Sequence, residues 1–337
     1  MNQDCSALGY SVKHYCAELG SDPLMVQGAG GNVSWKDGNT LWVKASGAWL
    51  ADAATRDIFV PVDLVDLRAS IDKGEFSAVP KLQALSELRP SIETLLHALM
   101  PHAVVVHLHA VEVLARLVRD TLQQELISRI GDALNWVVVD YHKPGAQLAA
   151  AIHNALQSRP DANVVFMKNH GLVIGGADVD AIRISLQSVI DRLCGKYVDA
   201  ADSALPVSRH ERYVAFADKA VQALALEDVY LQRLETSWAL YPDHVVFLGP
   251  KAHVYTSWDD LTRTCSSAAS LPELVFIRLS GVFVLQGFSK AKAAQLRCYY
   301  DVIVRQAPST LLSSMNNSQI AEVLNWDSEK YRQCLEK

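Results

Sequence analysis

The chain has 337 residues, of which 50% are hydrophobic and 20% are charged, and its formal net charge is −6 at pH 7. This length predicts about two globular domains, the weak negative charge excludes a basic nucleic-acid-binding surface, and no apolar run is long enough to span a membrane. The N-terminus lacks the pattern of a signal peptide, and the six cysteines are far apart with no Cys-x-x-Cys pair, so we expect free buried thiols and a cytoplasmic protein.

The first elements in chain order are a helix, a hairpin and a third strand. Apolar residues at helical spacing predict a helix over 6–19, with Gly20 as its C-cap. Short strands over 33–35 and 41–44 flank the turn at Asp37-Gly38, which is a strong hairpin signal. Residues 57–62 form another predicted strand, and Asp63 begins a helix or turn.

Two glycine-containing corners flank this hairpin. Gly28-Ala29-Gly30-Gly31-Asn32 can adopt positive φ angles and present successive N–H groups to an anion. Lys44-Ala45-Ser46-Gly47 adds a cation, a hydroxyl and a second open backbone segment. Together the corners are what a phosphate pocket needs, although ordinary turns at strand ends would look the same.

A short helix with an acidic residue near its start is predicted next. Ser91 is a good N-cap, and the apolar stripe that follows places Glu93 in the first turn of the helix. There the carboxylate can simply favour the helix dipole from a solvated position. His97 lies one turn further along the same face, where it either orients Glu93 or packs, and packing is the simpler interpretation.

The stretch Val104-Val105-Val106-His107-Leu108-His109 predicts a buried strand that ends in two histidines. Because side chains alternate along a strand, His107 and His109 point to the same side. Two imidazoles so placed suit a transition metal, but two hydrogen-bonded core histidines are the alternative.

A second strand that ends in histidine follows after a stretch of alternating helices and strands. Residues 111–126 and 147–156 are predicted to be helical, and 136–139 forms a strand between them. A buried strand from Asn163 ends at Asn169-His170-Gly171, the chain turns back into another strand, and 180–197 forms a long helix.

Residues 202–210 carry serine, proline and charge, and we interpret them as the boundary between a catalytic domain, 1–204, and a smaller α/β module, 205–337. Strands are expected near Val245–Leu248 and Val275–Ile277. Gly281-Val282-Phe283-Val284 and its following helix match Gly171-Leu172-Val173-Ile174 and its helix at the same spacing, with Ser280 in place of His170. The module is therefore interpreted as a degenerate partial repeat without the histidine, with coincidental similarity as the alternative.

His107, His109, His170 and Glu93 require one explanation. A catalytic zinc site uses three protein ligands and leaves a position open for substrate. A divalent cation at such a site polarises a carbonyl and stabilises an enediolate, and a nearby carboxylate moves protons as a general acid or base. The glycine corners would hold a phosphate away from the reacting carbons.

The ordered set of these motifs resembles the class II aldolase/adducin family, which includes L-fuculose-1-phosphate and L-rhamnulose-1-phosphate aldolases. The matching pieces lie within residues 5–200: Gly30-Gly31-Asn32-Val33-Ser34, Lys44-Ala45-Ser46-Gly47, Pro90-Ser91-Ile92-Glu93, His107-Leu108-His109 and Asn169-His170-Gly171. The motif sequences look closer to those of the longer rhamnulose-phosphate-aldolase-like proteins. Some of those are fused to a short-chain dehydrogenase, and this chain contains no complete dehydrogenase domain.

The resemblance implies an α/β fold whose mainly antiparallel central sheet is flanked by helices in three layers. It also implies a zinc-dependent aldolase of carbohydrate metabolism, or one that uses another divalent transition metal, and a homo-oligomer with sites near subunit interfaces. The ketose, expected to be phosphorylated, would be cleaved to a three-carbon ketone such as dihydroxyacetone phosphate and an aldehyde. The implied roles are zinc ligation by His107, His109 and His170, proton transfer by Glu93, and phosphate binding by Gly31, Asn32, Lys44, Ser46, Gly47 and Ser91.

Two departures weaken the phosphate assignment more than the metal assignment. Ala29 stands where the fuculose-phosphate enzyme has a threonine, and Ile92 replaces a second serine, so two hydroxyls are missing from the pocket. Lys44 is expected to compensate as a point charge; otherwise the substrate is a carboxylate or another sugar. The alternatives within the family are a sugar-phosphate 4-epimerase, decarboxylase or dehydratase. Outside catalysis, the alternative is an adducin-like interaction module, which would lack a full set of metal ligands.

Overall fold

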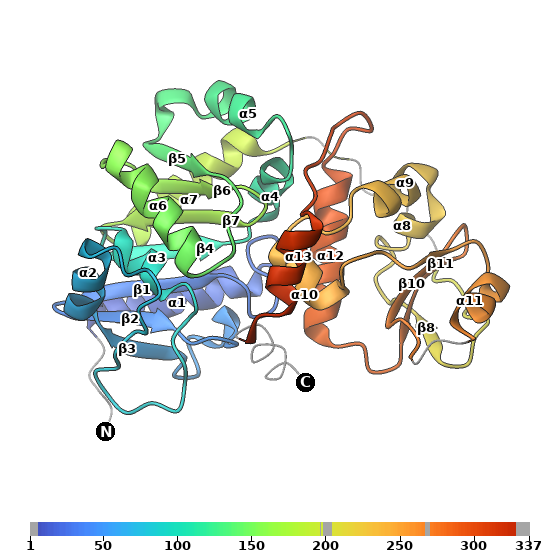
Figure 1. The fold of residues 1–337 in the computed structure, drawn as a ribbon, viewed down its shortest axis with the longest axis horizontal. Coiled ribbons are helices and arrows are strands. Elements are labelled where there is room, and N and C mark those ends of the chain that lie inside the picture. Colours follow the sequence, from blue (N-terminus) through green and yellow to red (C-terminus); the bar gives the residue numbers. More distant parts are fainter. Residues whose placement is uncertain (1–5, 196, 198–203, 267–269, 328–337) are drawn as a thin grey trace.

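The computed structural model describes residues 6–195, 197, 204–266 and 270–327. Two sheets organise this part of the chain, one of seven strands near the N-terminus and one of four strands near the C-terminus. In Figure 1 the large sheet lies on the left and the small sheet on the right. Between them lie α10 (Pro242–Leu248), α12 (Lys290–Val304) and α13 (Asn317–Leu324). The structure confirms the predicted α/β fold with a second, smaller α/β module.

The large sheet has the strand order β3-β2-β1-β4-β7-β6-β5. Adjacent strands run antiparallel, as predicted, except that β5 and β6 are parallel. The bounds are β1 (Asn32–Asp37), β2 (Thr40–Lys44), β3 (Phe59–Asp63), β4 (Val104–Leu108), β5 (Trp136–Val139), β6 (Val164–Met167) and β7 (Gly171–Gly176).

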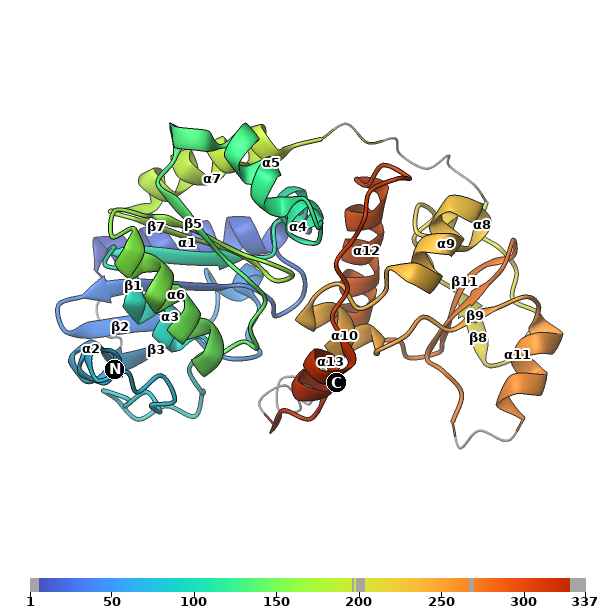
Figure 2. The same cartoon turned by 45° about the horizontal axis from the view of Figure 1, so that its top comes forward.

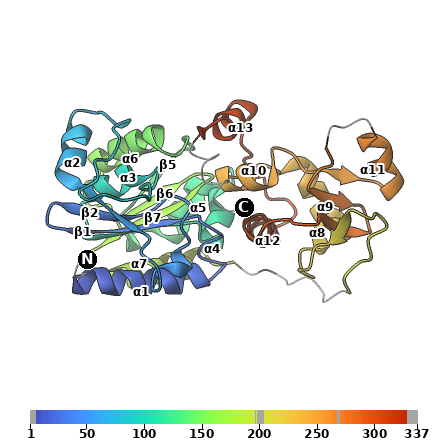
Figure 3. The same ribbon diagram turned by 90° about the horizontal axis from the view of Figure 1, so that it is seen from below.

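Helices cover both faces of this sheet, as Figure 3 shows. On one face lie α1 (Ala7–Ser21) and α7 (Val179–Leu193), and on the other lie α2 (Leu64–Asp72), α3 (Thr94–Leu99) and α6 (Ala146–Ser158). The alternation along β4 divides its side chains between the two cores: Val104 and Val106 pack in the first, and Val105 packs in the second. By the same alternation His107 points to the α3 and α6 face.

Several predicted boundaries of the first elements shift. Gly20 is not the C-cap of α1, because the helix continues to Ser21 and ends at Asp22. A Cβ at Gly20 would lie 2.1 Å from the backbone nitrogen of Ala51, so glycine is needed there for the close approach of the short 3-10 turn Leu50–Asp52. Asp63 caps α2 as predicted.

The predicted helix over 111–126 is two helices. They are α4 (Val111–Leu117) and α5 (Leu122–Arg129), and a 3-10 turn at Gly131–Ala133 leads on to β5. The chain between the two helices is tied to the C-terminal residues, because Val118 accepts a hydrogen bond from the backbone nitrogen of Ser313. Tertiary contacts therefore interrupt a segment whose local pattern favours one continuous helix.

The small sheet has the order β8-β11-β10-β9 and is seen on the right of Figure 2. Its elements, with the neighbouring helices, are β8 (Tyr213–Ala215), α8 (Ala223–Leu226), α9 (Asp228–Thr236), β9 (Val254–Tyr255), α11 (Trp258–Cys265), β10 (Leu274–Ile277) and β11 (Gly281–Leu285). The strand expected near Val245–Leu248 is wrong, because these residues belong to α10, whose seven residues are all buried. Part of the predicted boundary, residues 202 and 203, lies outside the described residues.

The small sheet repeats the order and register of β4-β7-β6-β5. On the β6–β7 hairpin Val164 pairs with Ile174, and 110 residues later Leu274 pairs with Val284 on the β10–β11 hairpin. Both hairpins turn through a residue with φ of 54°, Asn169 in the first and Leu279 in the second. The outer pairs match as well, because β9 runs parallel to β10 as β5 does to β6.

In the same register, the residues at the positions equivalent to the three histidines carry no imidazole. His107 pairs with Val173 on β7, and Ala215 pairs with Phe283 on β11. Ala217 then corresponds to His109, and Ser280 corresponds to His170. We propose that the chain divides near residues 204 and 205 and that the C-terminal module is a partial repeat that has lost its metal ligands.

The described residues contain no helix that is both long enough and apolar enough to cross a membrane. Within the same residues Cys16, Cys194, Cys265 and Cys298 are all unpaired. Cys16 and Cys298 are buried as predicted, whereas Cys194 is exposed. Cys5 and Cys334 lie outside the described residues.

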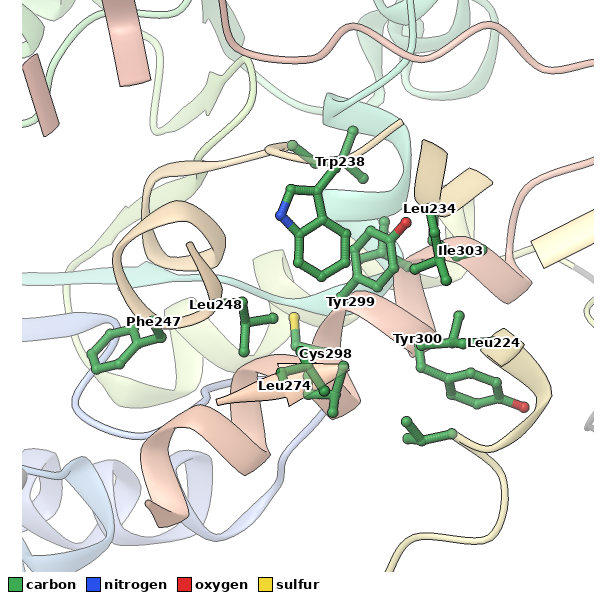
Figure 4. Close-up of a cluster of buried hydrophobic side chains, with 14 of the residues drawn as sticks. Leu224, Leu234, Trp238, Phe247, Leu248, Leu274, Cys298, Tyr299, Tyr300 and Ile303 are labelled. Atoms are coloured by element: carbon green, nitrogen blue, oxygen red, sulfur yellow. The ribbon is translucent and has the colours of Figure 1, made fainter. Parts of the chain in front are cut away.

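Aromatic and aliphatic side chains from α8, α9, α10 and α12 form the core of the C-terminal module (Figure 4). Within it, His244 packs against the rings of Trp238 and Tyr299, with ring centroids 4.2 and 4.7 Å away. Its Nδ1 accepts a hydrogen bond from the backbone nitrogen of Leu240. Burial lowers the pKa of His244 to about 3, so the ring is neutral in the folded protein.

This buried histidine predicts acid sensitivity of the fold. The unfolded chain protonates His244 near its ordinary pKa of about 6.5, so the free energy of unfolding should fall as the pH drops from there towards 3. His244→Asn keeps an acceptor but does not titrate. Its free energy of unfolding between pH 6 and 4 should fall less steeply than that of the wild type, by up to about 1.4 kcal/mol per pH unit. Urea unfolding at several pH values measures both slopes, and parallel curves would contradict the prediction.

Candidate active site

Pairing of β1, β4 and β7 brings together residues that are far apart in the sequence. Asn32 at the start of β1 lies opposite His107 on β4. His107 in turn lies opposite Val173 on β7, the strand that begins directly after His170. One end of the three central strands therefore brings together the glycine corner, the His-x-His motif and His170.

His107, His109 and His170 form a buried cluster in which one ring nitrogen of each lies within 4.8 Å of the others. The Nε2 atoms of His107 and His109 are 3.1 Å apart. Two nitrogen ligands of a tetrahedral zinc ion, each about 2.0–2.1 Å from the metal, are separated by about 3.3 Å. The donor set and its spacing thus fit a divalent transition metal.

The tautomer of His107 suits a ligand that binds through Nε2. Its Nδ1 lies 3.0 Å from the carbonyl oxygen of Leu172, which can accept the Nδ1–H. Burial, followed by the neighbouring imidazoles of His109 and His170, holds the pKa of His107 well below its usual range. The ring is therefore neutral, and its Nε2 lone pair faces the other two histidines.

Glu93 faces the same cluster. Its Oε2 lies 3.5 Å from the Nε2 of His107, and its Oε1 lies 3.4 Å from the Nε2 of His170. The Nδ2 of Asn32 donates to Oε2 at 2.7 Å. The prediction that Glu93 lies in the first helical turn is wrong by one residue, because Glu93 is itself the N-cap of α3. The Oγ of Ser91 accepts a hydrogen bond from the backbone nitrogen of Glu93. Glu93 is buried rather than solvated, so it does not merely favour the helix dipole from solvent.

His97 packs against the sheet. Its Nδ1 lies 2.8 Å from the Oγ of Ser34, and the ring is fully buried. Burial, with the charges of Lys36 and Lys44, lowers the pKa of His97 to about 3. The packing role expected from the sequence is the one the structure supports.

The residues assigned to phosphate binding line a common pocket with Glu93, His109 and His170. They are Gly31, Asn32, Lys44, Ser46, Gly47 and Ser91. Hydrogen bonds join the second corner to the segment before α3: the backbone nitrogen of Ser91 donates to the carbonyl of Lys44, and that of Ser46 donates to the carbonyl of Arg89. Gly31 and Gly47 have φ of +66° and +77°, the conformations that favour glycine.

The charge of Lys44 is held by backbone carbonyls. Its Nζ donates to the carbonyl oxygens of Ala29 and Ala48, at 3.0 and 2.5 Å, and the side chain is 1% exposed. The ammonium thereby ties the glycine loop to the segment after the second corner. It fixes the shape of the pocket, a contribution that differs from the freely placed point charge expected from the sequence.

Three further residues, which the sequence analysis did not single out, also line the pocket. Pro144 follows β5, and Pro242 and Asp243 begin α10 in the C-terminal module. The signal for α10 was present in the sequence, because proline is favoured in the first turn of a helix. The position of α10 beside the pocket could not be predicted from the sequence, since this position depends on how the two modules pack.

Close packing also explains one glycine of the second histidine motif. A Cβ at Gly171 would lie 2.4 Å from the carbonyl oxygen of Leu108 and 3.1 Å from the Cε1 of His107. Only glycine lets the turn after His170 approach the end of β4 this closely. The glycine of the Asn-His-Gly pattern is therefore a packing requirement of the histidine cluster.

Comparison with known proteins identifies a family and a curated relative that are similar to this chain. The profile of the family described as "Class II Aldolase and Adducin N-terminal domain" matches residues 12–197. A curated relative, "Uncharacterized oxidoreductase YuxG" of Bacillus subtilis (strain 168), is 30% identical over 224 residues, which are 61% of this chain and 32% of that protein. This chain therefore spans about a third of the length of that relative.

Similar solved structures cover a little more than half of the chain. The N-terminal class II aldolase domain of a conserved protein from Thermoplasma acidophilum is 25% identical, covers 57% of this chain and 94% of that chain, and has a TM-score of 0.48. L-fuculose-1-phosphate aldolase from Thermus thermophilus is 15% identical, covers 54% of this chain and 92% of that chain, and has a TM-score of 0.36.

Proposed function

The chain belongs to the class II aldolase and adducin family, and from this premise we propose that it is a metal-dependent aldolase that cleaves a ketose phosphate. The products are a three-carbon ketone, such as dihydroxyacetone phosphate, and an aldehyde. The observation that carries the proposal is the meeting of three buried imidazoles with the carboxylate of Glu93, which lies within 3.5 Å of two of them.

His107, His109 and His170 hold the cation, which is zinc or another divalent transition metal. When bound, the cation supplies a Lewis acid for the carbonyl and hydroxyl oxygens of the ketose. Three protein ligands leave room for those oxygens. Burial of all three rings keeps bulk water from competing for the donor atoms.

Glu93 carries the proton. Cleavage of the bond between carbons 3 and 4 requires the hydroxyl on carbon 4 to give up its proton as it becomes the aldehyde carbonyl. The bond's electron pair stays on carbon 3, and a proton must reach that carbon to complete the three-carbon ketone. Glu93 lines the pocket beside the histidines, and the amide of Asn32 holds its Oε2 at 2.7 Å. This contact orients the carboxylate, so Asn32 serves both Glu93 and the substrate.

The phosphate group binds away from the reacting carbons, at the two glycine corners. Gly31 and Gly47 bring backbone N–H groups to the pocket, and Ser46 and Ser91 bring hydroxyls. Lys44 contributes by holding the corners together. Anchoring the phosphate here leaves the carbonyl end of the ketose to the histidines and Glu93.

We further infer that the protein works as a homo-oligomer in the cytoplasm. The loop before Ser91 exposes the apolar side chains of Val79 and Leu85, which suits an interface between subunits. The unpaired cysteines of the described residues suit a reducing compartment.

Product analysis tests the proposed reaction. Zinc-loaded protein is offered six-carbon ketose 1-phosphates, including L-fuculose and L-rhamnulose 1-phosphates, and the corresponding free ketoses, and the products are identified by mass. A three-carbon ketone and an aldehyde are expected. An isomer of unchanged mass would indicate an epimerase, and loss of water would indicate a dehydratase. Absence of both bound metal and turnover would indicate an interaction module.

A further inference from the structure

The C-terminal module brings one acidic side chain to the histidine cluster. Asp243, the second residue of α10, places its Oδ2 3.3 Å from the Nδ1 of His109. Asp243 is 4% exposed and His109 is 5% exposed, so the contact is shielded from water. Gln295 on α12 donates to the same carboxylate oxygen at 3.4 Å.

The two nitrogens of His109 face different partners. Its Nε2 lies 3.1 Å from the Nε2 of His107, inside the cluster, and its Nδ1 faces Asp243. A neutral imidazole has one N–H, and the group that accepts it decides which nitrogen keeps a lone pair. A carboxylate at Nδ1 therefore leaves the Nε2 lone pair directed into the cluster, as the carbonyl of Leu172 does for His107.

We propose that Asp243 is a positioning residue for His109, supplied by the C-terminal module, which fixes the tautomer and orientation in which His109 binds a divalent cation. The inference rests on the metal centre proposed above. Carboxylates that hold metal-bound histidines in this way typically contribute a factor of about 10–100 to metal affinity.

Two features around the contact support a built arrangement. A Cβ at Gly30 would lie 3.1 Å from the Oδ2 of Asp243 and 3.2 Å from the Nδ1 of His109, so the glycine loop leaves space for their approach. The hairpin that carries His170 is held to the same C-terminal segment, because the Nδ2 of Asn169 donates to the carbonyl oxygen of Leu240 at 2.8 Å. Both histidine strand ends are thus anchored on residues 240–243.

Cobalt binding tests the proposal without an activity assay. Metal-free wild type and Asp243→Asn are titrated with Co²⁺ in competition with a chelator, and the visible absorption of bound Co²⁺ reports its coordination geometry. Asp243→Asn should bind Co²⁺ about 10- to 100-fold more weakly, with a changed spectrum. Asp243→Ala, which removes the acceptor altogether, should bind at least as weakly.

Asp301→Asn is the matched control. Asp301 on α12 is also 4% exposed, and its Oδ2 accepts from the Nε of Arg297 at 2.9 Å, away from the histidines. This variant should lose thermal stability but keep wild-type Co²⁺ affinity. If Asp243→Asn lowers thermal stability while its Co²⁺ affinity and spectrum stay at wild-type values, the contact is merely structural and the inference is wrong. Failure of the wild type to bind Co²⁺ would overturn the metal centre together with this inference.

Discussion

Glu93→Gln is expected to lower the rate of ketose cleavage by about 10²- to 10⁴-fold while the protein keeps its metal. Glutamine matches glutamate in size and can still accept the hydrogen bond from the Nδ2 of Asn32. It cannot take up or release a proton near neutral pH. Steady-state kinetics on the ketose phosphate, with metal content measured on the same sample, separates the lost proton transfer from a lost binding site.

Glu112→Gln provides a matched control for this prediction. Glu112 on α4 is also largely buried, and its Oε1 accepts from the Nε of Arg305 at 2.8 Å. Its replacement should lower the free energy of unfolding and leave the rate per folded molecule unchanged. A fully active Glu93→Gln variant would exclude Glu93 as the proton carrier, whatever the metal content.

His109→Ala should abolish metal retention. Removal of one of three imidazole donors leaves two, and water must replace the third in a buried pocket. The loss of affinity should exceed the factor of about 10–100 expected when only a supporting carboxylate is changed. Metal content after gel filtration, measured by mass spectrometry against protein concentration, gives the stoichiometry for wild type and variant.

His97→Asn controls for the removal of a buried histidine nearby. His97 bonds to Ser34 rather than to the cluster, so this variant should lose stability and keep its metal. Full metal retention by His109→Ala would show that the ligand assignment is wrong. Loss of metal in both variants would point instead to general damage of the fold around β4.

Local sequence patterns were sufficient for most elements of the N-terminal module. The Asp37-Gly38 turn and the apolar run before His107 each act over a few residues, and the structure has the hairpin and the strand that they predict. At Asp63, where a helix or a turn was expected, the structure has a helix. The ordered motifs also identified the family, whose profile matches residues 12–197.

Where a local pattern allows two conformations, tertiary packing decided which one forms. Val245-Val246-Phe247-Leu248 has the composition of a strand, yet it forms α10, because a run that is buried on all sides shows no period by which to distinguish helix from strand. Glu93 became the N-cap of α3 although Ser91 is the better capping residue, and the carboxylate turned inward to Asn32. Side-chain contacts across the sheet outweighed the helix-capping preference.

The sequence by itself determined the family and the α/β fold class, and it named the candidate site residues, since these depend on motifs and on alternation within single elements. Tertiary structure alone decided that Lys44 holds two backbone carbonyls and that Asp243, 73 positions beyond His170, faces a histidine from the other module. Such contacts join segments whose separation in the chain carries no information about their distance in space. The contact of Asp243 with His109 arises only when α10 is buried between the two modules, so the free energy of packing, rather than any local preference, places Asp243 at the site.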